Sequence, residues 1–199
     1  MPRSPGDAQP PASTVRPEHF EGLYSVDADP WNFTTSWYER RKYALTVAAL
    51  PQERYASAFE VGCSIGAMTA LLAPRCDALL AVDCAPTAVQ SARLALQGLA
   101  HVTIEQAQLP AELPDEAFDL VVTSEVLYYF TGADLTRLLD GLISRLRPGG
   151  DIVLAHWRAS DKSYGYDGFN VHDTVQRRPE LDTVVHHEDE NFVLDVLRR

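Results

Sequence analysis

The sequence predicts an α/β fold: a doubly wound, mostly parallel sheet of seven strands that ends in an antiparallel hairpin. The first observation is that short apolar runs alternate with helix-like segments after Pro51. Strands separated by helices cannot pair as hairpins, so they form a parallel sheet with helices on both faces. The second is an acidic turn, residues 188–191, that directly joins the last two strand candidates. The length of 199 residues suits one domain.

Seven segments have the apolar, β-branched character of buried strands. In chain order we expect them at residues 55–63, 78–83, 102–105, 118–123, 152–155, 183–186 and 192–197. The last two form the hairpin. Because helix-like segments separate most of the others, we expect those strands to be parallel, with their carboxyl ends at one edge of the sheet, where ligands bind in such folds.

Helix candidates show apolar residues three to four positions apart. We expect helices at residues 37–50, 65–73, 85–99, 134–146 and 171–177. Pro86 suits the first turn of the third helix, and Pro148-Gly149-Gly150 ends the fourth.

The chain divides into three parts. Residues 1–17 carry five prolines and little apolar surface, so we expect a disordered tail. Residues 18–50 form an N-terminal helical region, in which 19–31 show no clear periodicity. Residues 51–199 hold the alternating pattern and form the main domain.

Composition excludes several classes of function. Seventeen basic residues against 28 acidic ones leave a net charge of -11, which disfavours nucleic acid as a partner. Three cysteines without a C-x-x-C pair indicate neither a zinc site nor a disulfide scaffold, so we expect no metal and a reducing, cytoplasmic location. No apolar run approaches the ~20 residues that span a bilayer, and the start lacks the pattern of a signal peptide. We therefore expect no membrane partner.

One strand candidate runs through a tight turn into a helix. Gly62 and Gly66 let the backbone turn sharply and approach a ligand that a Cβ would block. A dinucleotide site requires three glycines in one register, but that register holds Gly62, Ser64 and Ala67. Glu60 lies inside the turn, where its carboxylate would repel a pyrophosphate. The pattern favours a cofactor without phosphate and disfavours a nicotinamide-dependent dehydrogenase.

Asp83 ends the second strand candidate, where an acid can bind both hydroxyls of a ribose. Its alternative role is a helix cap ahead of Pro86. Together with the glycine turn, these residues resemble motif I and the ribose-binding acid of the class I S-adenosylmethionine-dependent methyltransferases. The resemblance covers about residues 55–155, including 118–127 and 146–150.

This resemblance implies S-adenosylmethionine as the cofactor. The expected cofactor-binding residues are Glu60, Gly62, Cys63, Ser64, Gly66, Asp83, Cys84, Gln106, Ala107, Ser124, Trp31 and Lys42. Gln106 departs from the family, which usually has an aspartate against the adenine amine; its amide oxygen can accept the same bond. Trp31 can attract a sulfonium by cation–π interaction, or simply pack. Lys42 can meet the methionine carboxylate, or belong to a solvated helix face.

Five further segments are similar to the nodulation protein S family. They are residues 29–31, 37–42, 62–66, 72–76 and 124–129. That family methylates the free amine at the non-reducing end of a deacetylated chitin oligosaccharide. The resemblance implies an N-methyltransferase that acts on a small polar acceptor, such as the amine of an amino sugar, and an N-terminal region 18–50 that lies over the cofactor as a lid. Two alternatives are an O-methyltransferase of a small natural product and a non-catalytic S-adenosylmethionine-binding partner protein.

Three residues near the strand ends are candidates for the chemical step. Glu125 follows the fourth strand and can serve as a general base or only cap backbone amides. His156 follows the fifth strand. It can be a second polar group beside the acceptor, or it can cap the end of the strand with a hydrogen bond. Tyr128 can face the sulfonium or pack in the core. The loop at 161–168 can border the acceptor, whereas His186 and His187 suit a solvent-facing hairpin.

Overall fold

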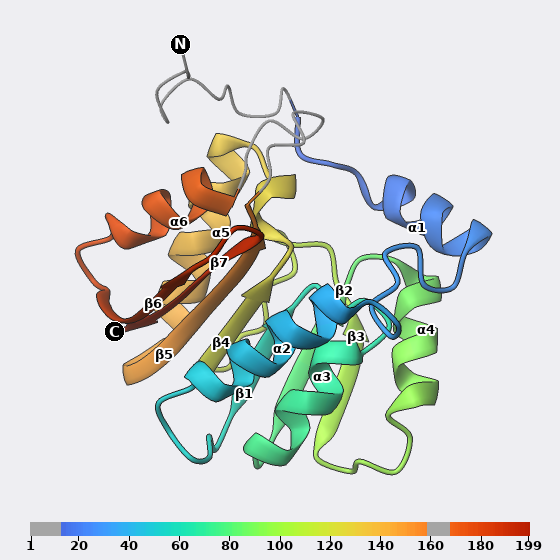
Figure 1. Ribbon diagram of the computed structural model, residues 1–199, viewed down its shortest axis with the longest axis horizontal. Helices are drawn as coiled ribbons and strands as arrows, with labels where there is room; N and C mark the ends of the chain where they lie inside the picture. Colours follow the sequence, from blue (N-terminus) through green and yellow to red (C-terminus); the bar gives the residue numbers. More distant parts are fainter. Residues whose placement is uncertain (1–12, 159–167) are drawn as a thin grey trace.

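The protein is a layered α/β domain in which one seven-stranded sheet separates two sets of helices (Figure 1). The structure is a computed structural model that describes residues 13–158 and 168–199. The strands are β1 (Ala58–Val61), β2 (Leu79–Asp83), β3 (Val102–Gln106), β4 (Phe118–Ser124), β5 (Leu146–Trp157), β6 (Asp182–Glu188) and β7 (Phe192–Arg198). Their order is β3-β2-β1-β4-β5-β7-β6. The predicted fold class is confirmed.

Six α-helices and two 3-10 turns occur in the described residues. They are α1 (Pro17–Val26), α2 (Trp37–Ala49), α3 (Ala67–Leu72), η1 (Ala73–Arg75), α4 (Pro86–Ala95), η2 (Leu127–Tyr129), α5 (Gly132–Arg145) and α6 (Gly168–Gln176). Thr131 caps α5 by accepting a hydrogen bond from the Asp134 amide, so this helix starts slightly before its predicted position.

The strand order reverses beside β1. β1 pairs in parallel with β2 on one side and with β4 on the other, and β4 pairs in parallel with β5. β7 runs antiparallel to both β5 and β6, as the predicted hairpin requires. The chain therefore leaves β1 and β4 in opposite directions, which opens a crevice at their carboxyl ends.

Alternation along the strands directs apolar side chains to both faces of the sheet. One apolar cluster joins the sheet to α5 and α6, through residues such as Leu138 and Val175. Clusters on the opposite face join it to α2, α3 and α4, through residues such as Tyr43, Leu72 and Ala92. Figure 1 shows α2 and α3 in front of the sheet and α5 behind it. Helices thus cover both faces of the sheet, which leaves its carboxyl edge as the place for a ligand site.

The N-terminal part differs from the sequence-based expectation. Residues 17–26 form a helix although their periodicity did not indicate one, because contacts with the body hold it. Glu21 accepts a hydrogen bond from the Thr87 amide at 3.0 Å, and the Tyr24 hydroxyl meets that of Ser64. The Val15 amide, inside the predicted tail, donates to the Tyr129 carbonyl at 2.9 Å.

Two other sequence-based expectations fall partly on residues that the structure does not describe. Residues 1–12 of the predicted tail and 161–167 of the predicted loop lie outside the described residues. Within the described ranges, no helix is both long and apolar enough to cross a membrane.

Candidate functional site

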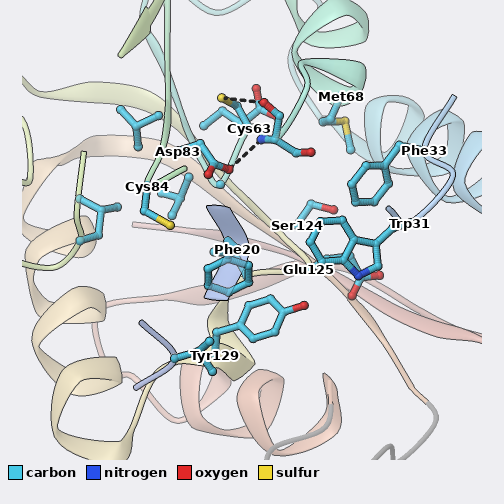
Figure 2. A pocket seen from close by; sticks show the side chains of 18 of the residues that line it. Phe20, Trp31, Phe33, Cys63, Met68, Asp83, Cys84, Ser124, Glu125 and Tyr129 are labelled. Atoms are coloured by element: carbon cyan, nitrogen blue, oxygen red, sulfur yellow. Dashed lines mark hydrogen bonds between the residues drawn. The ribbon is translucent and has the colours of Figure 1, made fainter. Parts of the chain in front are cut away.

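A cavity of about 570 Å³ lies at the carboxyl ends of β1, β2 and β4, under α1 and the start of α2. Figure 2 shows Asp83 and Cys84 on one side of it and the rings of Trp31 and Phe33 on the other. Its volume is in the range of sites for cofactors and other small molecules. Among the described residues that line it, four are acidic and none is basic; the acidic ones are Glu39, Glu60, Asp83 and Glu125. The lining therefore favours a ligand with positive charge.

The turn after β1 has the backbone conformation that its glycines indicated. Gly62 and Gly66 have φ angles of 74° and 85°, in the left-handed region. A Cβ on Gly62 would lie 2.9 Å from Cγ2 of Val126, and one on Gly66 would lie 2.9 Å from Cδ1 of Leu96. Ser64 also has a positive φ, 51°, without being a glycine. Such backbone strain persists only where neighbouring groups maintain it, and it occurs preferentially at functional sites.

Asp83 holds this turn in place. Its Oδ2 accepts a hydrogen bond from the Ser64 amide at 2.8 Å, and its Oδ1 accepts one from the Ala85 amide at 2.9 Å. Asp83 lines the cavity, and its contact with the Ala85 amide lies just before α4, whose N-cap residue is Ala85 and which has no side-chain cap. Burial raises its pKa, and the backbone amides oppose that rise.

Three lining residues have a buried side-chain oxygen without a hydrogen-bond partner among the described residues: Oε2 of Glu39, Oε2 of Glu60 and Oγ of Ser124. Oε2 of Glu39 lies 2.8 Å from Nζ of Lys42 in an ion pair, which leaves the other two. Burial, and then the nearby carboxylate of Asp83, raise the pKa of Glu60 to about 7. Buried polar atoms are normally hydrogen-bonded, so these two mark where a ligand's polar groups would fit. An amino group suits both.

The other expected cofactor residues divide into two groups. Cys63, Cys84, Ala107 and Trp31 line the cavity, whereas Gly66, Gln106 and Lys42 are not among its lining residues. The Gln106 amide nitrogen instead donates to the Cys84 carbonyl at 3.3 Å. Gln108, two positions further on, does line the cavity.

Sequence reasoning missed several lining residues from the N-terminal region. They are Phe20, Tyr24, Phe33 and Glu39. Phe20 and Tyr24 lie four positions apart, which places them on one face of a helix. That spacing was the signal that could have indicated α1 as a wall of the cavity.

Lys42 is fully buried, although its family resemblance suggested a cofactor contact. Its Nζ lies 2.5 Å from Oε1 of Glu125 and 2.8 Å from Oε2 of Glu39. It also lies over the rings of Tyr38 and Tyr43, at 4.8 and 5.4 Å from their centroids. Lys42 therefore lies between two carboxylates, compensates one of their two charges and is not exposed to the cavity.

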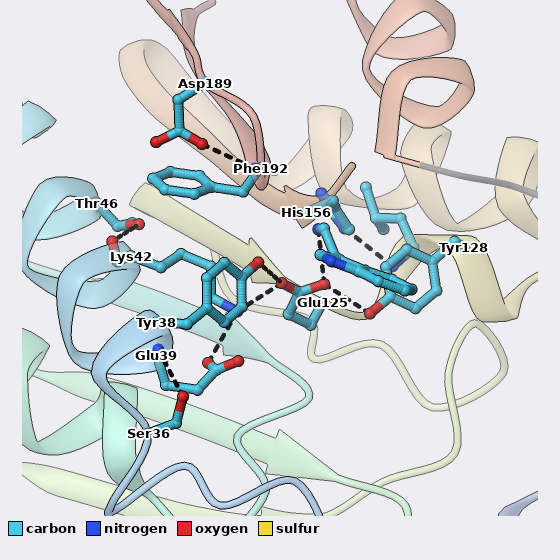
Figure 3. Close-up of polar contacts among 12 residues, drawn as sticks. Ser36, Tyr38, Glu39, Lys42, Thr46, Glu125, Tyr128, His156, Asp189 and Phe192 are labelled. Carbon is cyan, nitrogen blue, oxygen red and sulfur yellow. Dashed lines mark hydrogen bonds and ion pairs between the residues drawn. The ribbon is translucent and has the colours of Figure 1, made fainter. Parts of the chain in front are cut away.

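Glu125 lies at the centre of the polar contacts on the other side of the cavity (Figure 3). Its Oε1 accepts hydrogen bonds from Lys42 and from the Tyr38 hydroxyl at 3.3 Å. Its Oε2 accepts them from the Tyr128 hydroxyl at 2.6 Å and from the Trp157 amide at 2.9 Å. Since a carboxylate has about four acceptor positions, all are used. The residue also has a φ of 54°, a strained value that these contacts maintain.

Tyr128 and His156 occupy different positions relative to the cavity. Tyr128 lines it, and burial raises the pKa of its hydroxyl well above the usual value, so the group stays protonated. His156 is fully buried behind the wall and is not among the lining residues. Its Nε2 accepts a hydrogen bond from the Leu127 amide at 3.2 Å. Of the two roles considered for His156, the geometry therefore supports the hydrogen-bonded strand end rather than contact with an acceptor.

The sheet order, the glycine turn and the acid after β2 define the class: this is the fold of the class I methyltransferases. The chain belongs to the nodulation protein S (NodS) family, whose model matches residues 23–167.

Individual relatives agree with this assignment. The chain is 35% identical over 132 residues to nodulation protein S of Rhizobium tropici, covering 65% of this chain and 56% of that protein. A crystal structure of a Pseudomonas syringae protein is 41% identical, with a TM-score of 0.74 over 82% of this chain and 100% of that one. The N-methyltransferase NodS of Bradyrhizobium japonicum WM9 in complex with S-adenosylhomocysteine has a TM-score of 0.83 at 23% identity, over 93% and 99% of the two chains. The chain thus spans little more than half of the Rhizobium tropici relative.

Proposed function

We propose that this chain is an S-adenosylmethionine-dependent N-methyltransferase that methylates the amine of a small polar acceptor, an amino sugar or a deacetylated chitooligosaccharide. The observation that carries the proposal is the cavity at the strand ends, with four acidic side chains and no basic one among its described lining residues. Both the sulfonium cofactor and an amine acceptor carry positive charge, so both suit this lining. Membership of the NodS family supports the same choice.

The β1–β2 side of the cavity fits the cofactor. Asp83 is placed at the end of β2 to accept hydrogen bonds from ribose hydroxyls, and the unpartnered Oε2 of Glu60 suits the amino group. The turn from Gly62 to Gly66 brings the backbone close to the ligand, because neither glycine carries a Cβ. When bound, the cofactor supplies an electrophilic methyl group on a sulfonium.

The β4–η2 side fits the acceptor. The Tyr128 hydroxyl donates a hydrogen bond to Glu125, so its oxygen can accept one from an amine N–H. Glu125 has its acceptor positions filled and is paired with Lys42, so its role in the proposal is to orient Tyr128 and Tyr38. An acceptor that arrives as a cation must first lose a proton, because only the neutral amine has a free lone pair; orientation of that lone pair toward the methyl group would supply much of the rate.

We also propose that residues 18–50 are the lid and residues 51–199 the cofactor-binding domain. Phe20 and Tyr24 of α1 and Tyr38 of α2 cover the cavity, and a covering element excludes water and completes a site. The three free cysteines support a cytoplasmic location. The acidic charge of the chain supports a small-molecule partner rather than nucleic acid.

Incubation with S-adenosylmethionine and a panel of amine and hydroxyl acceptors tests the proposal. We expect methylation of glucosamine or deacetylated chitooligosaccharides on nitrogen, detected by mass spectrometry and located by NMR. Methylation of a hydroxyl would indicate the O-methyltransferase alternative. Binding of S-adenosylhomocysteine in calorimetry without turnover of any acceptor would indicate a non-catalytic binding protein.

A further inference from the structure

A chain of buried polar groups lies behind the wall of the cavity. The Leu127 amide donates to Nε2 of His156, and Nδ1 of His156 lies 3.0 Å from Nε2 of His172. Nδ1 of His172 in turn lies 2.5 Å from Oδ2 of Asp195. His156 and Asp195 are fully buried and His172 is 2% exposed. This row of hydrogen-bonded groups therefore connects η2, β5, α6 and β7 in the buried interior.

The hydrogen bonds determine the protonation state of both rings. Because Nε2 of His156 accepts from an amide, its proton must be on Nδ1, from which it donates to His172. Nε2 of His172 then accepts, so its proton is on Nδ1 and is donated to Asp195. Both rings are neutral and every ring nitrogen has a partner. Burial, the largest cause, lowers the pKa of His156 well below its ordinary value, in agreement with a neutral ring.

This chain of groups ends at the turn that carries Tyr128. His156 holds the Leu127 amide in η2, and its ring meets the ring of Tyr128 edge to face at 5.5 Å (Figure 3). The Tyr128 hydroxyl then reaches Glu125, whose backbone is strained. A strained turn keeps its geometry only if its surroundings hold it. The buried histidine is one of the contacts that hold this one.

We propose that His156 and His172 are positioning residues for the proposed methyl transfer: as a neutral pair anchored on Asp195, they fix the η2 turn and thereby the orientation of Tyr128 toward the acceptor. The inference rests on the proposed function for its kinetic test. Neither residue lines the cavity, so their loss affects turnover and leaves the cofactor contacts in place. A site displaced by about an ångström can lose ~10²-fold in rate.

The same arrangement predicts how acid affects the site. The charged and titratable groups that face the two rings are Asp195 of β7, Lys42 of α2 and Tyr128 of η2, with His186 of β6 on the far oxygen of Asp195. A proton added to His156 at Nε2 would compete with the Leu127 amide for the same lone pair. Turnover should therefore fall in acid while affinity for S-adenosylhomocysteine changes less.

The variants His156→Leu and His156→Gln test the proposal as a pair. Leucine removes both hydrogen bonds, whereas a glutamine oxygen can accept from Leu127 and its amide can donate to His172. We expect kcat to fall about tenfold or more in His156→Leu, affinity for S-adenosylhomocysteine to stay within about twofold, and His156→Gln to recover most of the loss. His172→Leu is the second variant if His156→Leu does not fold. Equal losses of kcat and of affinity, or no loss of kcat in folded His156→Leu, would overturn the proposal.

Two readouts separate this inference from the proposed function, because they need no acceptor. The ¹⁵N shifts of the histidine rings should report neutral rings with the proton on Nδ1 in both His156 and His172; an Nε2-protonated or doubly protonated ring would overturn the inference. A crystal structure of His156→Leu, or of His172→Leu, should show Tyr128 displaced from Glu125. An unchanged turn would overturn the positioning role even if no acceptor is found.

Discussion

Two glutamates on the two sides of the cavity use their carboxylates in opposite ways. On the β1–β2 side, Oε2 of Glu60 has no hydrogen-bond partner among the described residues, while Asp83 beside it contacts backbone amides. On the β4–β5 side, Glu125 accepts hydrogen bonds from three side chains and one backbone amide. Glu60 thus keeps an oxygen free for a ligand, whereas both oxygens of Glu125 are used within the protein. The comparison indicates that the β1–β2 side is a binding surface and that the β4–β5 side is a pre-organised support opposite it.

The largest expected effect comes from breaking the support. Lys42→Met leaves Glu39 and Glu125 without their buried cation, and removing one partner of a buried ion pair costs about 3–5 kcal/mol of unfolding free energy. The matched control is Arg177→Met, which removes an exposed pair with Asp173 and should change stability by less than about 1 kcal/mol. Urea unfolding measures both. A loss in Lys42→Met no larger than in the control would contradict the comparison.

Glu60 and His156 should contribute to the unfolding free energy with opposite pH dependence. Glu60 has its pKa raised from 4.5 to about 7, so the folded state binds more protons than the unfolded state in this window. Its contribution is present below about pH 4.5 and is lost as pH rises through 7, by up to about 3 kcal/mol. His156 has the opposite sign, because its pKa is lowered and stability is lost as pH falls below 6.5.

Comparison of the wild type with Glu60→Gln isolates the first of these two effects. His156 is present in both proteins, so their difference in unfolding free energy should grow in favour of the variant as pH rises from about 4.5 to 7. Denaturation at several pH values measures it. A difference that is constant over this range would show that Glu60 titrates normally.

Asp83→Ala tests the binding side. Loss of a charge-assisted hydrogen bond costs about 1.5–3 kcal/mol, so affinity for S-adenosylhomocysteine should fall tenfold or more. The exposed Asp77→Ala is the control, since its carboxylate contacts only Arg54 at the surface. Calorimetry decides the matter: unchanged affinity in folded Asp83→Ala would remove this residue from the cofactor site.

Glu125→Gln is expected to act on turnover alone. A carboxamide retains one acceptor oxygen, but its NH₂ group would face two donors, so either Lys42 and Tyr38 or Tyr128 and Trp157 lose an acceptor. We expect kcat to fall about tenfold while affinity for S-adenosylhomocysteine is retained. Steady-state kinetics with a competent amine and calorimetry measure the two quantities. Turnover at the parent level would exclude Glu125 from the chemical step, and loss of affinity would assign it to the cofactor.

The smallest expected effect concerns the lid. Tyr24→Phe removes the hydroxyl that meets Ser64 while the ring stays against Trp31, at 5.5 Å between centroids. One neutral hydrogen bond contributes about 0.5–1.5 kcal/mol, so affinity for S-adenosylhomocysteine should fall a few-fold. Deletion of residues 1–12 is the control and should leave affinity unchanged. Equal behaviour of the two proteins in calorimetry would contradict a lid role for α1.

Much of the fold followed from local patterns. Alternation of apolar strands with amphipathic helices predicted the parallel sheet, and an acidic turn predicted the hairpin. The left-handed turn at Gly62 and Gly66 could also be expected, since only glycine adopts such angles without cost. Helix α1 was not expected, because its mixed aromatic and acidic residues show no clear periodicity; contacts with Ser64 and Thr87 hold it against the domain.

The sequence by itself determined the succession of strands and helices along the chain, the glycine turn and the acid at the end of β2. Each depends on residues within a few positions of one another, or on a pattern that repeats along one element. Only the tertiary structure decided the partners of Lys42 and His156. Lys42 lies 83 positions from Glu125, and His172 lies 16 positions from His156 on a different element. Such pairings depend on where packing places α2 and α6 against the sheet, and no local pattern encodes that placement.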